Sequence, residues 1–329
     1  KKQGIDIYAV SPQNEPLNGG NTASTRMPWN AESEFVKVLA STFKQKGLKT
    51  KIYVYDHNFN YDDQKAQNDY PIKVYSALGE DFEGSELVVG SAYHDYGGDP
   101  SELFDIHSQR PDKQIIFTEA SLGDWNDGRD LGRGTTNVNS ETHLNEDMER
   151  LMIGLLNKYC TAVIYWNLML DNNGGPKLRG GCQTCCGAVD IDSKNYSSLN
   201  FNRHYYIISQ TSAVVRPRAV WISSYKMEEI ASAVFRNPDG SYAMLISNNG
   251  ASDMEVGVSD HSFAWHVDVK LPTESIVSLL IPYRGIVSSI KKTETEHSAD
   301  NKYYSIDGKH ITTPTVGQIF IHKGKKVIQ

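Results

Sequence analysis

Short apolar runs alternate with amphipathic stretches along the first two thirds of the chain. The runs that we expect to form strands lie at residues 5–10, 51–58, 86–94, 113–120 and 161–168. Apolar positions then recur every three or four residues, the period of a helix that buries one face, near 32–45, from 71, from 100, near 141–159 and near 203–212. Strands that alternate with helices in this way predict a parallel sheet with right-handed crossovers.

Polar and aromatic residues gather where these runs end. They are Asn14, Glu15, His57, His94, Tyr96, Glu119, Trp166 and Asn167. The carboxyl ends of parallel strands meet at one edge, and in a (β/α)8 barrel that edge carries the active site. We therefore expect an α/β fold that is the C-terminal part of a (β/α)8 barrel, with about five βα units. Three further units would lie before Lys1, which agrees with the abrupt start of the chain and its lack of a signal peptide.

The pattern changes after Arg216 and Pro217. Six short strand-like runs follow one another, separated by turns such as Asn237-Pro238-Asp239-Gly240, which predicts an all-β sandwich. We expect a partial (β/α)8 catalytic barrel at 1–216, a β-sandwich side domain at 217–285, and a linker with a C-terminal β tail at 286–329. The charge-rich run KKTETEHSADNK is expected to be a solvated linker.

Charge and composition exclude some classes of function. The formal net charge is −7 and the isoelectric point about 5.8, so nucleic-acid binding has no electrostatic support. No apolar run is long enough for a transmembrane helix, and we expect no membrane span. The 18 Tyr residues suit sugar binding, because each ring has an apolar face and a polar tip, although a merely tyrosine-rich surface is an equal alternative.

Three of the four cysteines, Cys182, Cys185 and Cys186, lie within five positions, and Cys160 is separate. A small disulfide and free thiols are both compatible with this spacing. A structural zinc site needs about four ligands, and no nearby Cys/His pair completes such a set. We expect no metal and no cofactor.

Two glutamates are the candidates for catalysis. Glu15 ends the first strand and Glu119 ends the fourth, 104 positions later. Hydrolysis of a glycosidic bond needs one proton donor and one carboxylate that attacks the sugar or directs water. Two Glu on the same rim meet that requirement, and Asn14 beside Glu15 is able to hydrogen-bond a sugar hydroxyl. A single Glu after a strand would more commonly be a solvated loop residue.

Five motifs in order carry a resemblance to a known family. SPQNEP, SAYHDY, IIFTEAS, YWNLMLDNNGGP and the closing strand-rich module, over about 280 residues, resemble family 30 glycoside hydrolases, which include lysosomal glucosylceramidase. The resemblance implies that Glu15 of the NEP motif is the acid/base and that Glu119 of TEAS is the nucleophile. It also implies that Asn14 binds the sugar 2-hydroxyl.

The remaining matched positions are implied to bind substrate or to support the pair. His94 and Tyr96 match a His-x-Tyr motif whose Tyr is placed to hydrogen-bond the nucleophile. Trp166 and Asn167 match the Trp-Asn of the eighth barrel strand, which walls the sugar subsite. Each aromatic has an alternative role, Tyr96 as a rim residue and Trp166 in core packing, and His57 is expected to be structural.

The resemblance implies a retaining β-glycosidase that cleaves β-glucosidic or related linkages, with a β-glucan or β-glycoside as substrate. The chain departs from the family pattern by lacking the first three barrel strands, so we expect the missing N-terminal half of the barrel to be required. The alternative is a catalytically impaired carbohydrate-binding fragment of such an enzyme. The loop GGCQTCCG either shapes the rim near the sugar or is a disulfide-pinned turn.

The tail YYSIDGKHITTP…IFIHKGKKVIQ resembles C-terminal sorting segments of secreted bacterial glycan-degrading enzymes, with an ordinary small β module as the alternative. We accordingly expect a secreted, periplasmic or cell-surface bacterial protein.

A retaining mechanism sets two expectations for the glutamate pair. The two carboxyl groups should lie roughly 5 Å apart. The pKa of Glu15 should exceed that of Glu119, because an acid must keep its proton where a nucleophile must not.

Overall fold

The computed structural model describes residues 3–20, 25–59, 64–120, 142–177, 185–223, 227–259 and 265–282, together with short stretches between 303 and 328. The chain divides into two compact units, residues 1–283 and 284–329. The domain boundaries expected from the sequence at 216 and 285 stay predictions.

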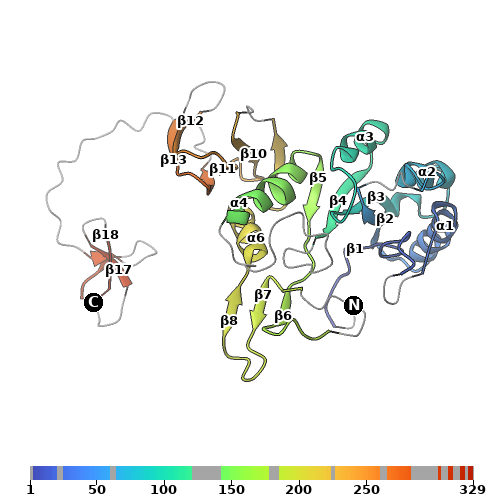
Figure 1. The fold of residues 1–329 in the computed structure, drawn as a ribbon, viewed down its shortest axis with the longest axis horizontal. Helices are drawn as coiled ribbons and strands as arrows, with labels where there is room; N and C mark the ends of the chain where they lie inside the picture. Colours follow the sequence, from blue (N-terminus) through green and yellow to red (C-terminus); the bar gives the residue numbers. More distant parts are fainter. Residues whose placement is uncertain are drawn as a thin grey trace. The chain divides into compact units, whose positions relative to one another are not determined.

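A five-stranded parallel sheet forms the first part of the larger unit (Figure 1). Its strands are β1 (Ala9–Val10), β2 (Lys51–Asn58), β3 (Val88–His94), β4 (Gln114–Glu119) and β5 (Cys160–Val163). They lie in chain order, and every neighbouring pair is parallel. All five expected strands are therefore present, with β1 and β5 shorter than their apolar runs.

Helices connect the strands and cover the sheet. They are α1 (Trp29–Gln45), α2 (Tyr70–Leu78), the 3-10 turn η1 (Ser85–Leu87), α3 (Glu102–Gln109), α4 (Thr142–Met148), the π-helical turn η2 (Glu149–Ile153), α5 (Gly154–Leu156) and α6 (Arg203–Val214). Figure 1 shows α1, α2 and α3 along one side of the sheet. Pro71 lies in the first turn of α2, where its missing N–H costs no helical hydrogen bond.

Burial explains why the strand signals in the sequence are nearly continuous apolar runs. Six of the eight residues of β2 are buried, because both faces of a parallel sheet are covered. On the helix side, α1 buries Val36 and Ala40, four positions apart on one face, in the same core as Val54 and Phe117 of the sheet.

The sheet is open, as expected for five units. Within the described residues β1 and β5 are its two edge strands. Apolar side chains are exposed near both: Ile5 is 64% and Ile7 58% exposed beside β1, and Ile164 is 53% and Leu168 76% exposed beyond β5.

A small sheet that the sequence did not predict follows β5. It consists of β6 (Met169–Asp171), β7 (Val189–Ile191) and β8 (Leu199–Phe201), with β6 parallel and β8 antiparallel to β7. Three-residue strands are too short to show a period of two. Besides the backbone pairing, Asn202 braces the sheet by donating to the carbonyl of Gly187 and to Asp190, both at 2.7 Å. Cys185, which precedes β7, is disulfide-bonded, and Cys182 lies outside the described residues.

Six antiparallel strands form the predicted sandwich. They are β9 (Val220–Ile222), β10 (Ile230–Arg236), β11 (Tyr242–Asn248), β12 (Met254–Ser259), β13 (His266–Leu271) and β14 (Ser275–Ile281). One sheet has the order β14-β11-β10-β9, and β12 pairs with β13. Asn145 of α4 ties the sandwich to the helices by donating to the carbonyls of Asn248 and Ser275, both at 3.0 Å.

The second unit contains four short antiparallel strands. They are β15 (Tyr303–Tyr304), β16 (His310–Ile311), β17 (Ile319–His322) and β18 (Lys325–Ile328), in the order β16-β15-β17-β18. The expected linker falls within 283–302, outside the described residues. In the described part of the chain, no helix combines the length and apolar character needed to cross a membrane.

Gly90 permits the close approach of β3 and β4. A Cβ at this position would lie 2.1 Å from the carbonyl oxygen of Gln114 and 2.9 Å from the Tyr53 ring. We expect Gly90→Ala to lower the free energy of unfolding by roughly 3 kcal/mol, because the strand backbones must separate to admit the methyl group. Urea unfolding of the full-length protein measures this change. Gly19→Ala is the matched control, since its Cβ would meet only Arg26 at 3.6 Å; equal stability losses in both variants would contradict the prediction.

Candidate active site

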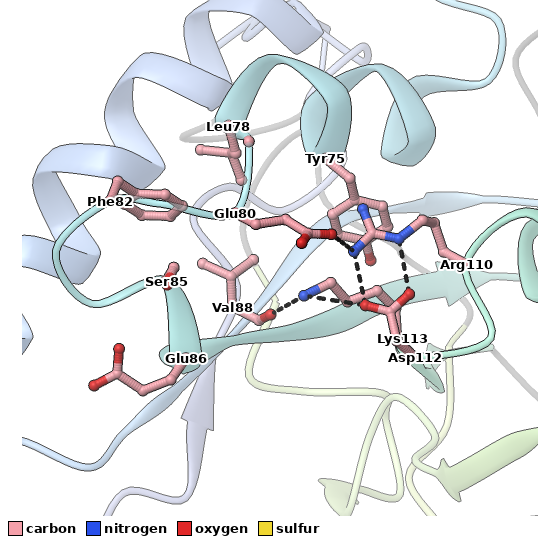
Figure 2. Close-up of a pocket in the computed structure, with 11 residues that line it drawn as sticks. Tyr75, Leu78, Glu80, Phe82, Ser85, Glu86, Val88, Arg110, Asp112 and Lys113 are labelled. Carbon is pink, nitrogen blue, oxygen red and sulfur yellow. Dashed lines mark hydrogen bonds and ion pairs between the residues drawn. The ribbon is translucent and has the colours of Figure 1, made fainter.

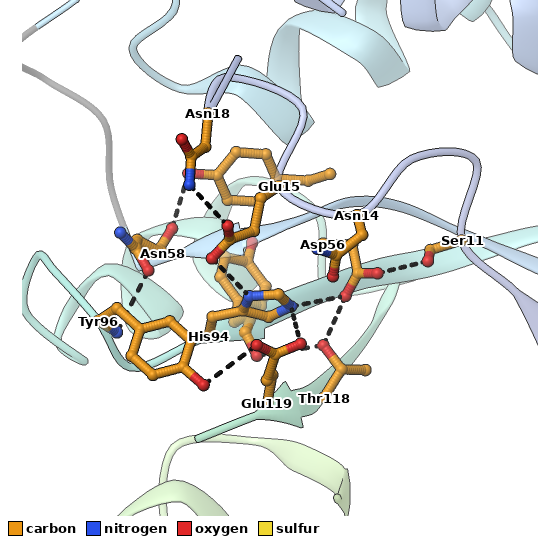
Figure 3. Close-up of polar contacts among 12 residues, drawn as sticks. Ser11, Asn14, Glu15, Asn18, Asp56, Asn58, His94, Tyr96, Thr118 and Glu119 are labelled. Carbon is orange, nitrogen blue, oxygen red and sulfur yellow. Dashed lines mark hydrogen bonds and ion pairs between the residues drawn. The ribbon is translucent and has the colours of Figure 1, made fainter. Parts of the chain in front are cut away.

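The two expected catalytic glutamates face each other at the carboxyl edge of the sheet (Figure 3). Glu15 lies in the loop after β1, is 7% exposed, and donates its backbone N–H to the carbonyl of Asp56 at 3.0 Å. Glu119 is the last residue of β4, and its side chain is 23% exposed. One carboxylate oxygen of each residue lies within 4.8 Å of the other. This separation agrees with the roughly 5 Å expected of a retaining pair.

Two residues from the end of β3 contact this pair. The hydroxyl of Tyr96 donates to Oε1 of Glu119 at 3.1 Å. His94 is 1% exposed, and its ring lies among three carboxylates (Figure 3). Nδ1 is 3.5 Å from Glu15, while Nε2 is 3.1 Å from Asp56 and 4.0 Å from Glu119. Substrate binding by His94 stays a prediction, and its burial against these carboxylates favours a supporting role.

Asp56 is the acidic member of this cluster that was not predicted from the sequence. It accepts hydrogen bonds from Ser11, from Thr118 at 2.6 Å and from His94 at 3.1 Å. The available signal was its place near the end of β2, in a run where only His57 was considered. His57 is 1% exposed, and burial lowers its pKa to about 4.

The cluster sets the pKa values of the two glutamates in the order opposite to the one expected. Burial would raise the pKa of Glu15, but contacts from His94 and Asn18 outweigh it and lower the pKa to about 2. Burial raises the pKa of Glu119, which His94 and Tyr96 only partly oppose. The expected order is wrong for this structure because the cationic partner, His94, lies closer to Glu15 than to Glu119.

The other expected site residues lie in the loop after β1 and in the segment after β5. Asn14 is exposed beside Glu15, and its carbonyl accepts from Gln13 at 3.0 Å. Trp166 and Asn167 follow β5, the strand next to β4, and are joined by a cis peptide bond. Trp166 is 36% exposed.

The donor set at the site also meets a geometric criterion for metal binding. Glu15, His94 and Glu119 each offer one ligand atom, and these atoms lie within 4.8 Å of one another; no other such set occurs among the described residues. All three groups already have protein contacts, from Asn18, Asp56 and Tyr96. We interpret the set as an ion-paired catalytic cluster.

A cavity of about 360 Å³ lies at the amino ends of β3 and β4, away from the glutamates (Figure 2). Arg110 donates to both carboxylate oxygens of Asp112, at 2.8 and 2.7 Å, and Lys113 donates to the carbonyl of Val88 at 2.9 Å. The guanidinium lies 5.0 Å from the centre of the Tyr75 ring. Arg110 and Lys113 are thus already paired within the protein. The cavity therefore gives no indication of a second site like the one formed by Glu15 and Glu119.

A parallel βα sheet with two facing glutamates at its carboxyl edge, followed by a β-sandwich, is the arrangement of a barrel-type glycoside hydrolase. Residues 1–198 match the description "Glycosyl hydrolase family 30 TIM-barrel domain", and residues 219–279 match "Glycosyl hydrolase family 30 beta sandwich domain". The chain therefore belongs to glycosyl hydrolase family 30. The resemblance drawn from its motifs and the expected fold class are both confirmed.

Similar proteins are glucanases and glucosylceramidase relatives. The chain is 28% identical over 297 residues to the endo-1,6-beta-D-glucanase BGN16.3 of Trichoderma harzianum, covering 86% of this chain and 53% of that protein. It is 28% identical over 295 residues to the putative glucosylceramidase 2 of Caenorhabditis elegans, covering 85% and 53%. The solved structure of the endo-beta1,6-glucanase BT3312 is 45% identical with a TM-score of 0.76, covering 86% of this chain and 60% of that one. The chain thus spans little more than half the length of these relatives.

The Tyr96 hydroxyl stabilises the ionised form of Glu119, so Tyr96→Phe should raise the pKa of Glu119 further, by about one unit. Carbon-13 NMR titration of the glutamate carboxyl groups in the full-length protein measures this shift. Tyr159→Phe is the matched control, because Tyr159 precedes β5 at the opposite end of the sheet and stacks on His107. An unchanged Glu119 titration in Tyr96→Phe would show that the hydrogen bond does not act on this carboxylate.

Proposed function

We propose that the full-length protein is a retaining β-glycosidase whose substrate is a β-1,6-linked glucan. The observation that carries the proposal is the pair of carboxylate oxygens from Glu15 and Glu119 within 4.8 Å of each other, which is shorter than the roughly 6.5–9.5 Å that separates the carboxyl groups of an inverting enzyme. The glucan is favoured because the relative at 45% identity and the Trichoderma protein are both named endo-β-1,6-glucanases.

In this mechanism Glu119 attacks the anomeric carbon while Glu15 protonates the departing oxygen. Water then attacks the glycosyl-enzyme bond, and Glu15 takes the proton of that water. Glu119 is suited to attack because Tyr96 holds one of its oxygens. Glu15 must gain a proton before the first step, and a bound sugar that removes water from its carboxylate favours the protonated form.

A carbohydrate-binding fragment without catalysis is the alternative. Both carboxylates and the Tyr96 contact are in place, which favours hydrolysis. The need for further barrel units remains a prediction from the sequence. We also infer an extracytoplasmic location, which the disulfide of Cys185 supports, since disulfides persist in oxidising compartments.

The proposal predicts that the full-length protein shortens linear β-1,6-glucan and releases the β-anomer first, as followed by proton NMR. Glu119→Gln should lower kcat by roughly 10⁴-fold or more, because the attacking carboxylate is gone. Glu15→Gln should lower it by about 10²- to 10⁴-fold on glucan. On an aryl glycoside, whose leaving group needs no proton, Glu15→Gln should keep a fast first step.

Glu34→Gln serves as the control for these variants, because Glu34 is exposed on α1, away from the site. Release of the α-anomer first would contradict retention. Binding of glucan without any cleavage would support the fragment alternative. Cleavage of β-1,3- or β-1,4-glucan in preference to β-1,6-glucan would leave the mechanism standing and overturn the proposed substrate.

A further inference from the structure

Asp56 joins the three chain segments that carry the site. Its carboxylate accepts from Ser11 in the loop after β1, from Thr118 beside Glu119 on β4, and from His94 at the end of β3. Its carbonyl also accepts the backbone N–H of Glu15. Asp56 itself is 7% exposed, so its carboxylate depends on these donors rather than on water.

The backbone of β2 is distorted where it presents this side chain. Tyr55 and Asp56 have φ angles of 77° and 59°, in the left-handed region, and the register between β2 and β3 shifts between Tyr55 and His57. Such residues are strained, and they persist where the surrounding structure holds them. Glu32 of α1 provides part of that support by accepting the N–H of Tyr55 at 2.9 Å.

The position of His94 implies a charged ring. Nε2 hydrogen-bonds Asp56 at 3.1 Å, and Nδ1 lies 3.5 Å from Glu15, at ion-pair distance without a formed hydrogen bond. A neutral imidazole has only one N–H, so one of its nitrogens would direct a lone pair at a carboxylate, whereas an imidazolium donates from both. The titratable groups that face this ring come from every neighbouring segment: Glu15 after β1, Asp56 and His57 on β2, Tyr96 after β3, and Glu119 on β4.

We propose that Asp56 is a positioning residue that holds His94 as an imidazolium, and that the Nδ1 proton of this imidazolium is the proton that Glu15 donates to the departing oxygen. This inference rests on the proposed function. The proton moves from Nδ1 to Oε1 of Glu15, which leaves a neutral His94 whose remaining N–H is donated to Asp56. Glu15 passes the proton to the glycosidic oxygen as the bond to carbon breaks. In the second step, the proton of the attacking water returns through Glu15 to Nδ1.

The electrostatics of the cluster agree with this arrangement. Burial disfavours the charged ring, but Asp56 and Glu15 outweigh burial and raise the pKa of His94 to about 9. Burial would likewise raise the pKa of Asp56, but contacts from His94, Ser11 and Thr118 lower it. Both directions, a raised pKa for His94 and a lowered pKa for Glu15, favour a resting cluster with the proton on His94 and Glu15 ionised beside it.

The direct test is an NMR titration of His94 in the full-length protein, with its signal assigned by comparison with His94→Gln. In the unaltered protein we expect the ring to stay charged through pH 8, because both nitrogens face carboxylates. In Asp56→Asn the ring should titrate at least about two pH units lower, since the amide removes one negative charge at hydrogen-bond distance. Asp105→Asn, an exposed change on α3, should leave the titration unaltered.

Two results would overturn the inference. One is a His94 that is neutral at pH 7 in the unaltered protein, a measurement that holds even if Asp56→Asn fails to fold. The other is an Asp56→Asn protein that melts cooperatively and titrates at His94 as before.

A kinetic test separates this inference from the proposed function. In Asp56→Asn the basic limb of the kcat/KM profile on β-1,6-glucan should move to lower pH by at least about one unit, because the last proton of the Glu15–His94 pair is lost earlier. Thr118→Val removes a donor to Asp56 but keeps its charge, so it should lower the rate without moving that limb. An unmoved limb in Asp56→Asn, with activity that still requires Glu15 and Glu119, would refute this inference alone. An unaltered protein that cleaves no glycan would refute the proposed function, while the NMR titration would still decide the state of His94.

Discussion

Two buried carboxylates and one half-buried carboxylate repel one another at one edge of a parallel sheet, and the imidazole of His94 is the side chain that lies close to all three. Its nitrogens lie 3.1 Å from Asp56, 3.5 Å from Glu15 and 4.0 Å from Glu119. Without a cation at that point, desolvation and mutual repulsion would both favour protonated carboxyl groups. The position of this ring therefore favours the ionised form of each acid of the site, and it opposes the effect of burial on all three. These short distances require the ends of β2, β3 and β4 and the loop after β1 to lie close together around the His94 ring.

Strand order provides that meeting. Each strand lies beside its predecessor and runs parallel to it, so residues distant in sequence share one edge. Regular strand geometry alone does not orient the side chains of the cluster. Tyr55 and Asp56 have left-handed backbone conformations, which interrupt β2 where the cluster begins. The buried carboxylate of Glu32 accepts the N–H of Tyr55 in this distorted segment, and burial raises the pKa of that acid to about 7. A helix residue outside the site thus supports the shape of the strand end, which in turn places Asp56.

Sequence patterns were sufficient to predict the longer strands and helices and to select the two glutamates. The strands β2, β3 and β4 appear as apolar runs because both of their faces are covered, and the motifs around Glu15 and Glu119 identified the family. The small sheet of β6, β7 and β8 could not be foreseen, because strands of three residues are too short to show a periodic pattern, and contacts such as those of Asn202 join residues that are distant in sequence. Asp56 was missed for a related reason. Its importance comes from positive φ angles and from partners on three other segments, neither of which leaves a local mark in the sequence.

The same limit explains why the pKa order was inferred wrongly. When each glutamate is considered by its expected role alone, the proton donor Glu15 should have the higher pKa. In the structure the two acids share one cation, and the distances to His94 favour ionisation of Glu15 over that of Glu119. The pKa values of such a cluster belong to the whole set of coupled groups rather than to one residue. An ionised acid in the free protein is compatible with the proposed mechanism as long as a proton donor lies close by, and His94 Nδ1 is 3.5 Å from Glu15.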